Sequence, residues 1–346
     1  MNKAQKKDWV KLILDNFIWI ILAVLFTYFA VNIPNFTLKS NLINILLHAS
    51  VLGILAIGQT IVLLTGNFDL SAEGMVSLST IFAMWLMLEP GIRGEAQGSG
   101  LMMNPFLVIP IILLLGTIVG FLVGTMITQL KMNGFIVTLA MQLSLRGAAM
   151  ILSNGQIMTG SPKAFNWLGS AKVAGFPVSI IVTILMFLFV NYLLNNSKFG
   201  RELRAVGANP DAAAASGFNP KRTITLAYTI GGFLAAFAGW MLLGRLETSI
   251  STLGEGYTLE TVAASVIGGV SLKGGVGSVG GAFAGVMLLS LIDNALNLMS
   301  VDSFWVEAVR GFIILIALLI EAQKFRYKPK VIHEPAIEKP AVSGTK

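Results

Sequence analysis

Three charged side chains lie deep inside long apolar runs: Arg146, Asp293 and Arg310. Each lies about 6–7 residues from one end of its predicted helix, which is roughly 10 Å at 1.5 Å per residue. Asp293 and Arg310 fall at matching depth on consecutive antiparallel helices, so we predict an ion pair, with Asn294 and Asn297 as neighbouring hydrogen-bond partners. Such a pair either fixes the register of two helices or marks a polar pathway.

A second group of polar residues interrupts an apolar part of the chain. Gln59, Asn67, Asp69 and Ser71 lie there, and Glu73 follows. Polar groups inside a membrane are costly unless they find partners or water. The stretch therefore fits either a broken helix that lines a polar pathway or a hairpin turn at the membrane surface. The candidate pathway residues are Gln59, Asn67, Asp69 and Asn294.

Patterns that indicate catalysis or a bound cofactor are missing from the sequence. There is no cysteine, and His48 and His333 are too few for a histidine-rich metal site. No Ser–His–Asp set and no G-x-x-x-x-G-K-[ST] sequence occur, so the chain holds no P-loop for ATP. Gly275 to Gly280 matches G-x-G-x-x-G, but it lacks an acidic residue about 20 positions on, so we interpret it as a tight turn before a closely packed helix. We expect no enzyme activity, cofactor or metal in this chain.

The composition indicates a membrane protein. The 346 residues are 55% hydrophobic and 12% charged, whereas a soluble domain is about a quarter charged. We expect an all-α, polytopic membrane protein with about ten transmembrane helices. The predicted spans are 12–33, 42–66, 70–89, 106–129, 135–153, 177–195, 224–245, 259–270, 279–300 and 304–322.

The lysine and arginine residues predict the orientation in the bilayer. Most of the 24 fall in segments on the same side as the N-terminus, which places both termini in the cytoplasm. Because these residues cluster at the ends of apolar runs, the net charge of +7 indicates no nucleic-acid partner. We expect a cytoplasmic segment 1–11, a transmembrane domain 12–322 and a disordered cytoplasmic tail 323–346.

One polar, basic segment, 196–223, is much longer than a turn requires and carries its own helix signal. Asn209-Pro-Asp supplies an N-cap, a proline for the first helical position and an acidic residue for the first turn. Ala212–Ala215 favours a helix, Gly217 ends it and Pro220 prevents its return. We expect a short, rigid, exposed helix on which a soluble partner presses.

Glycine residues spaced by four predict close helix packing. In lipid, helix contacts depend on how closely the backbones approach each other. The two sets are Gly116, Gly120, Gly124 and Gly277, Gly281, Gly285.

Several segments resemble a known family of membrane permeases. Asp211-Ala-Ala-Ala-Ala-Ser-Gly is similar to the EAA loop of ABC importer permeases, with Asp in place of Glu and without the Ile-x-Leu-Pro that usually follows. Together with Thr65-Gly-Asn-Phe-Asp-Leu-Ser, Gly256-Tyr-Thr-Leu-Glu and Gly268-Gly-Val-Ser-Leu-Lys-Gly-Gly-Val-Gly, it resembles the ribose/galactose/xylose-type family from about residue 40 to 322. Asn67 departs from the family pattern, in which we expect glycine.

This resemblance implies a transport function and a set of partners. The fold would resemble the vitamin-B12-type (type II) importer permease, in the cytoplasmic (inner) membrane of a bacterium. The partners would be a second permease, identical or not, an extracytoplasmic sugar-binding protein and a cytoplasmic ATPase that binds ATP and Mg. The substrate would be a monosaccharide or a related neutral polyol. The residues that would couple to the ATPase are Gly207, Asn209, Asp211, Ala212, Ala213, Ser216 and Gly217.

Other functions remain open from the residues alone. An ion-coupled secondary transporter would need a titrating carboxylate near an unwound helix, and Asp69 is a candidate. An ABC importer of nucleosides and a structural or signalling membrane protein without a substrate are further alternatives.

Overall fold

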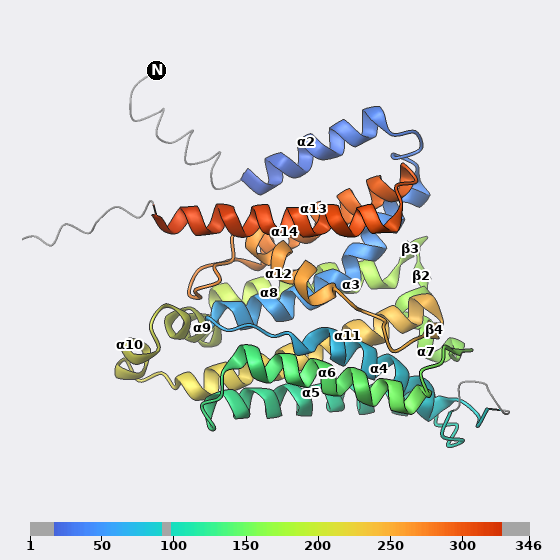
Figure 1. The fold of residues 1–346 in the computed structure, drawn as a ribbon, viewed down its shortest axis with the longest axis horizontal. Helices are drawn as coiled ribbons and strands as arrows, with labels where there is room; N and C mark the ends of the chain where they lie inside the picture. The colour runs from blue at the N-terminus through green and yellow to red at the C-terminus, as the bar shows by residue number, and fades with distance from the viewer. Residues whose placement is uncertain (1–16, 92–97, 327–346) are drawn as a thin grey trace, which may run out of the picture.

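The computed structural model describes residues 17–91 and 98–326. The described chain is largely helical, as predicted, and its short strands form two antiparallel pairs (Figure 1). The predicted segment 1–11, the first residues of span 12–33 and all but the start of the tail 323–346 lie outside the described residues. The first residues of that tail belong to the last helix.

Each of the ten predicted spans coincides with a helix. Among the described residues, six helices are long and apolar enough to cross a membrane, and three others are shorter apolar helices. The crossing of the bilayer by all ten stays a prediction. The helices are α2 (Phe17–Asn32), α3 (Lys39–Leu64), α4 (Ser71–Met87), α5 (Pro105–Thr128), α6 (Gly134–Ser153), α8 (Val178–Asn196), α11 (Pro220–Leu246), α12 (Tyr257–Ile267), α13 (Val279–Leu298) and α14 (Ser303–Arg326).

The smaller elements lie at opposite ends of the helical bundle (Figure 1). At one end are α9 (Lys198–Ala208) and α10 (Pro210–Ala215), and we call this the α10 end. At the other end are α7 (Lys163–Ser170) and the paired strands, where Trp240 of α11 donates a hydrogen bond of 2.9 Å to the carbonyl of Phe165. The strand pairs are β1 (Met158–Thr159) with β4 (Thr248–Ser249), and β2 (Lys172–Val173) with β3 (Phe176–Pro177).

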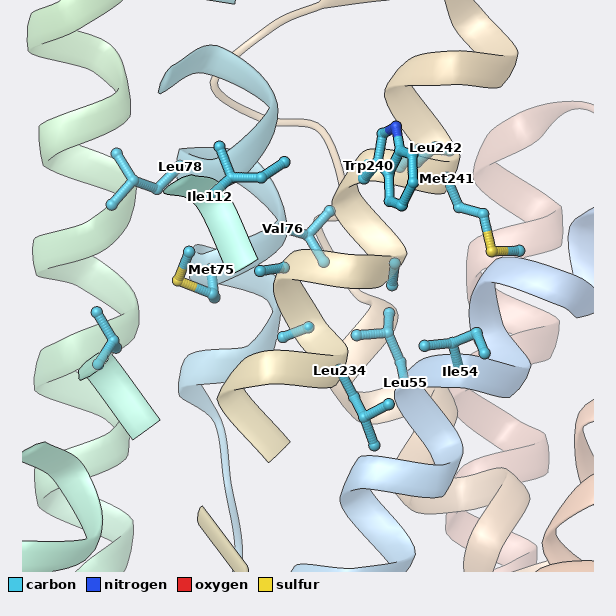
Figure 2. Close-up of a cluster of buried hydrophobic side chains, with 14 of the residues drawn as sticks. Ile54, Leu55, Met75, Val76, Leu78, Ile112, Leu234, Trp240, Met241 and Leu242 are labelled. Atoms are coloured by element: carbon cyan, nitrogen blue, oxygen red, sulfur yellow. The ribbon is translucent and has the colours of Figure 1, made fainter. Parts of the chain in front are cut away.

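Helix α11 lies at the centre of the fold. Figure 2 shows Leu234 and Trp240 of α11 among apolar side chains from α3, α4 and α5. On the α5 side, Gly116 faces the carbonyl of Gly232, and Gly120 faces the carbonyl of Tyr228, so a Cβ at either glycine would overlap the other backbone. The predicted close packing through the first glycine set is therefore confirmed.

The second glycine set divides between a helix and a turn. Gly281 and Gly285 of α13 face the carbonyls of Gly268 and Ala264, which lie at the end of α12. Gly277 precedes α13 with φ +152°, so it lies outside the helix, but a Cβ there would lie only 3.0 Å from the backbone of Val270, just after α12. Gly275, at φ +76°, belongs to the same turn, which agrees with our interpretation of the G-x-G-x-x-G match as a turn.

Helix α4 begins in the interior of the fold and not at its surface. After α3 ends at Leu64, residues 65–70 form no helix and run back from the α10 end towards the middle of the bundle (Figure 1). Glu73, in the first turn of α4, contacts Gln142 near the middle of α6. Its backbone N–H donates to Thr258 in the first turn of α12. The chain is thus broken inside the bundle, which is one of the two arrangements considered for this stretch.

Candidate coupling helix and substrate pathway

The short helix α10 has the cap predicted from the sequence. The side-chain oxygen of Asn209 accepts hydrogen bonds of 3.0 Å from the backbone N–H groups of Asp211 and Ala212, which satisfies two free N-terminal donors. Gly217 ends the helix in a left-handed conformation at φ +86°. All of its side chains except that of Ala213 are at least partly exposed. This surface is therefore free for a contact with another protein.

Two features beside α10 differ from the sequence interpretation. Pro220 does more than prevent the return of the helix, because it is the first residue of α11, with Asn219 as its N-cap. Helix α9 was not predicted. Its signals were the N-cap Ser197, whose oxygen accepts from the N–H of Gly200, and the apolar pair Leu203 and Val206 on one buried face.

At the end of α9, three backbone segments meet without intervening side chains. Gly207 lies so close to the carbonyl oxygen of Leu64, the last residue of α3, that a Cβ would overlap it. The same oxygen accepts a hydrogen bond of 2.9 Å from the N–H of Gly275. Gly274, at φ +83°, lies against Gly66. We call this contact of Gly66, Gly207, Gly274 and Gly275 with Leu64 the glycine junction.

The candidate pathway residues Asn67 and Asp69 hold the non-helical segment in place. Asp69 is buried, and its Oδ1 accepts from the backbone N–H of Ser71 at 2.9 Å and from its hydroxyl at 2.6 Å. Asn67 donates to the hydroxyl of Thr65 at 3.0 Å. The phenol of Tyr228 on α11 donates to the carbonyl of Phe68 at 2.6 Å. These bonds satisfy polar groups that have no helical partners.

Glu73 joins the first turns of two short helices. One carboxylate oxygen accepts from the side-chain amide of Gln142. The other accepts from the N–H groups of Gly256, at 3.1 Å, and Thr258, at 3.4 Å, at the start of α12. A carboxylate at a helix N-terminus stabilises the free N–H groups and the helix dipole there. Glu73 thus caps α12 from α4.

Next to Glu73, Arg146 forms a two-point ion pair with Glu255. The Nη1–Oε1 and Nη2–Oε2 distances are 3.0 and 2.5 Å. A pocket of about 10 Å³ lies between these groups and Ser77, which is room for about one water molecule. The depth of Arg146 was evident from the sequence, but Glu255 was not identified as its partner, because it lies more than 100 residues away in the chain.

The predicted contact between Asp293 and Arg310 is present. Their Oδ2 and Nη2 atoms are 3.0 Å apart. Arg310 also reaches Glu260 of α12, with Nη1 and Oε1 2.5 Å apart. Glu260 is 2% exposed, and it was missed, although a carboxylate inside the short apolar span 259–270 was the available signal. One guanidinium thus balances two carboxylates on two helices, and the function of this triad stays a prediction.

The hydrogen bonds expected beside this ion pair are absent. Asn294 instead exchanges two hydrogen bonds of 2.9 Å with Asn41 of α3, and Asn297 is exposed. The prediction was wrong because Asn294 follows Asp293 directly, and successive helix residues point in different directions. Asn294 joins α13 to the start of α3.

The four candidate pathway residues do not form one site. Asn294 pairs with Asn41 near the start of α3, while Asn67 follows the end of the same helix. Leu64 lies 23 positions after Asn41, which corresponds to roughly 35 Å along the helix axis. Gln59 is buried in α3, and within the described residues its Nε2 has no hydrogen-bond partner. Nor do the described residues contain a cluster of acidic, histidine or cysteine side chains that could hold a metal.

Comparisons with known proteins place this arrangement in a family. The ribose import permease protein RbsC of Escherichia coli is 34% identical over 84% of this chain and 88% of its own length. The L-arabinose transport system permease protein AraH and the galactose/methyl galactoside import permease protein MglC, also of Escherichia coli, are 32% and 30% identical over 90% and 95% of this chain and 90% and 100% of their own lengths. No solved structure matches the chain.

The family model for the permease component of branched-chain amino acid transport systems matches residues 41–318. That range contains α10, the non-helical segment 65–70 and the Glu73, Arg146 and Arg310 contacts. This chain therefore belongs to that family of transport permeases.

Proposed function

We propose that the chain is the membrane-spanning permease subunit of an ATP-driven ABC importer that moves a monosaccharide or a related neutral polyol into the cell. The observation that carries this proposal is the similarity to three permeases of sugar importers over most of their lengths. The family description names branched-chain amino acids. The three relatives, whose names refer to sugars, cover 84–95% of the chain, so we propose a sugar as the substrate. ATP and Mg would be bound by a partner ATPase.

The exposed helix α10 supports the proposed coupling to that ATPase. Its cap and its left-handed Gly217 make it short and rigid, so a push on it would displace α9 as a unit. In our proposal, Asn209, Asp211, Ala212, Ala213, Ser216 and Gly217 form the surface that contacts the ATPase. Gly207 transmits the displacement to the glycine junction.

The glycine junction links α9 to the chain segments next to α4 and α12. Leu64 precedes the non-helical segment that leads into α4, and Gly275 follows the turn that leaves α12. A movement of Gly207 would therefore shift α4 and α12 together, because their first turns are joined through Glu73. Interfaces of this kind move between discrete arrangements and do not deform continuously.

The meeting point of α4 and α12 is our proposed place for the substrate pathway. These helices are the third and eighth of the ten predicted spans, and short or interrupted spans in matching positions of two halves point to transporter binding sites. The side chains of Arg146 and Glu255 are 26% and 59% exposed there. Charged groups at membrane depth avoid acyl chains, so we infer that this face of α6 borders water or a second permease subunit. Gln59, Asn67, Asp69 and Asn294 stay proposals as further pathway residues.

In this proposal the α10 end and both chain termini face the cytoplasm of a bacterium, and the chain lies in its inner membrane. Two permeases of the type II fold, identical or not, would pair around the pathway. An extracytoplasmic sugar-binding protein would deliver the substrate at the end that carries α7. Support for this orientation comes from the basic residues of the 196–223 segment.

The contact with an ATPase is testable because the chain contains no cysteine. Ala214→Cys places one thiol on an exposed position of α10. A short bifunctional thiol reagent should join it to a single-cysteine ATPase of the same complex. Lys172→Cys, exposed in β2 at the opposite end, is the control and should form no link. Absence of a link from Ala214→Cys would overturn the coupling assignment.

Uptake in proteoliposomes separates the sugar importer from the alternatives. We expect uptake of a labelled monosaccharide to require ATP and the binding protein, and to survive collapse of ion gradients. Uptake that persists without nucleotide and stops with the ion gradient would favour a secondary transporter. Uptake of nucleosides in preference to sugars would favour a nucleoside importer.

Changes in α10 should uncouple transport without unfolding the chain. Gly217→Pro forces φ from +86° to about −65°, and Asp211→Ala removes the acid at the helix N-terminus, worth about 0.3–1 kcal/mol. We expect both variants to insert at wild-type levels while sugar uptake falls and ATP hydrolysis continues. Normal import by both would contradict the assignment.

A further inference from the structure

Two grooves of similar size lie on the outside of the helical bundle. One, of about 490 Å³, lies between α5 and α11 near the α10 end. The other, of about 510 Å³, lies between α2, α3 and α13. The second is lined almost entirely by apolar side chains such as Trp19, Phe26 and Met287. The first differs because one end of it is basic.

The basic end of the α5–α11 groove is formed by the first turn of α11. Lys221 and Arg222 line it and are exposed. Lys221 makes a long hydrogen bond of 3.4 Å to Gln129, at the end of α5, and within the described residues neither cation has an ion pair. None of the described residues that line the groove is acidic. The N-terminus of α11 adds a further positive field at this point.

Away from this end, the groove continues into the apolar part of the bundle. Phe121 of α5 and Leu226 of α11 form its walls, and both are exposed, at 52% and 41%. Thr229, at the inner end, is nine residues beyond Pro220, or roughly 13 Å along the helix axis. The groove therefore extends from the membrane surface to a depth that the first part of an acyl chain occupies.

This combination fits one kind of molecule from the bilayer. A phosphate would lie between Lys221 and Arg222, where two cations and the amide of Gln129 provide donors. An acyl chain would lie between Phe121 and Leu226. A basic pocket between membrane helices typically binds an anionic lipid headgroup. The α2–α3–α13 groove lacks the cations, so acyl chains would enter it without selection for the headgroup.

We propose that the α5–α11 groove is a binding site for one anionic glycerophospholipid, held by Lys221 and Arg222 at its headgroup. This site goes beyond the proposed import of sugar and does not depend on the substrate. It lies at the first turn of α11, which begins at Pro220, three residues after the Gly217 that ends α10. The bound lipid would steady the helix that follows α10.

The experiment measures lipid retention by the purified, full-length chain. The probe is fluorescent phosphatidylglycerol, compared with phosphatidylcholine carrying the same acyl chains. We expect wild type to prefer phosphatidylglycerol. Lys221→Gln with Arg222→Gln should lower that preference by roughly 30-fold, because each cation near an anionic headgroup contributes about fivefold.

A matched control keeps the charge change but moves it off the groove. Lys198→Gln with Arg201→Gln removes two exposed cations from α9 at the same end, and its preference should stay within about twofold of wild type. Equal losses in both double variants would mean general attraction to anionic membranes and would overturn the site. Equal retention of both lipids by wild type would overturn it too.

A second pair of variants tests the acyl-chain part. Leu226→Trp fills the groove while leaving both cations in place and should abolish the preference. Leu114→Trp, at an exposed position of α5 that does not line the groove, should retain it. Inorganic phosphate in excess should not displace the bound lipid. Full displacement by phosphate, or an unchanged preference in Leu226→Trp, would mean that the site binds a free anion and not a lipid.

Discussion

The glycine junction and the charged contacts of the interior hold the same helices by different physical means. At the junction, Gly207 and Gly275 meet the carbonyl of Leu64 directly, with no side chain between them. Around Glu73 and Glu260, the contacts run through long side chains and ion pairs. Direct backbone contact transmits a displacement from one segment to the next, because no side chain lies between them that could change its rotamer and absorb the movement. Side-chain ion pairs can break and re-form as helices move.

This difference assigns each region a part in the proposed transport cycle. The junction would pass movement from α10 to α4 and α12, and the ion pairs would permit those helices to take new positions. Removing a charge should therefore destabilise the fold strongly where the ion pair is buried. Adding one methyl group at a glycine of the junction should impair transport strongly, although the group is small, because it would overlap the facing backbone.

The largest effect should follow from removing the shared cation of the triad. Arg310→Ala leaves Glu260 and Asp293 facing each other in the interior, and breaking a buried pair typically costs about 3–5 kcal/mol. Thermal unfolding of the detergent-purified chain measures the loss. Glu260 is more deeply buried than Asp293, so its unpaired charge should cost more. Adding Glu260→Gln to Arg310→Ala should therefore recover part of the lost stability.

Charge reversal then tests the pair predicted from the sequence. Asp293→Arg and Arg310→Asp should each destabilise the chain, and the double change should recover part of the loss. If the double variant recovers nothing, the pairing of these two residues does not stabilise the fold.

A single methyl group at the glycine junction should have the next largest effect. Gly207→Ala places a Cβ on the carbonyl oxygen of Leu64, and forcing such an overlap costs about 1–3 kcal/mol. We expect import to fall far more than the amount of inserted protein does, as measured by uptake per molecule. Gly147→Ala in α6 is the control, because its Cβ meets no atom within 4 Å. Equal uptake by the two variants would show that close backbone contact is not required.

The smallest effect should come from the exposed pair of Arg146 and Glu255. The hydrogen bond from Arg146 lowers the pKa of Glu255 below its ordinary value. A carboxyl group whose pKa is lower in the folded than in the unfolded state stabilises the fold at pH values above its unfolded-state pKa. This stabilisation is lost as the pH falls through the folded-state pKa. Solvent screening limits the contribution to about 1 kcal/mol. The Tm difference between wild type and Glu255→Gln should therefore be small at pH 7 and vanish in acid. A difference that grows in acid would contradict this assignment.

Local patterns in the sequence determined much of this protein. Runs of apolar residues located the ten helices, since a membrane span needs about 20 of them. Asn209, Pro210 and Gly217 predicted α10, because capping depends on neighbouring residues only. Asp293 and Arg310 could be paired because they lie on consecutive helices joined by a short turn. The family resemblance rested on motifs within such segments.

Only the tertiary structure decided which distant groups meet. Glu260 joins Arg310, Asn294 pairs with Asn41, and Glu73 caps α12, although each pair is far apart in the chain. The interior start of α4 also depends on a contact between distant residues, because the hydroxyl of Tyr228 on α11 donates to the carbonyl of Phe68. Hydropathy and capping report the local surroundings of a residue. The packing of helices, which the glycines bring close together, determines the partners of a buried polar group.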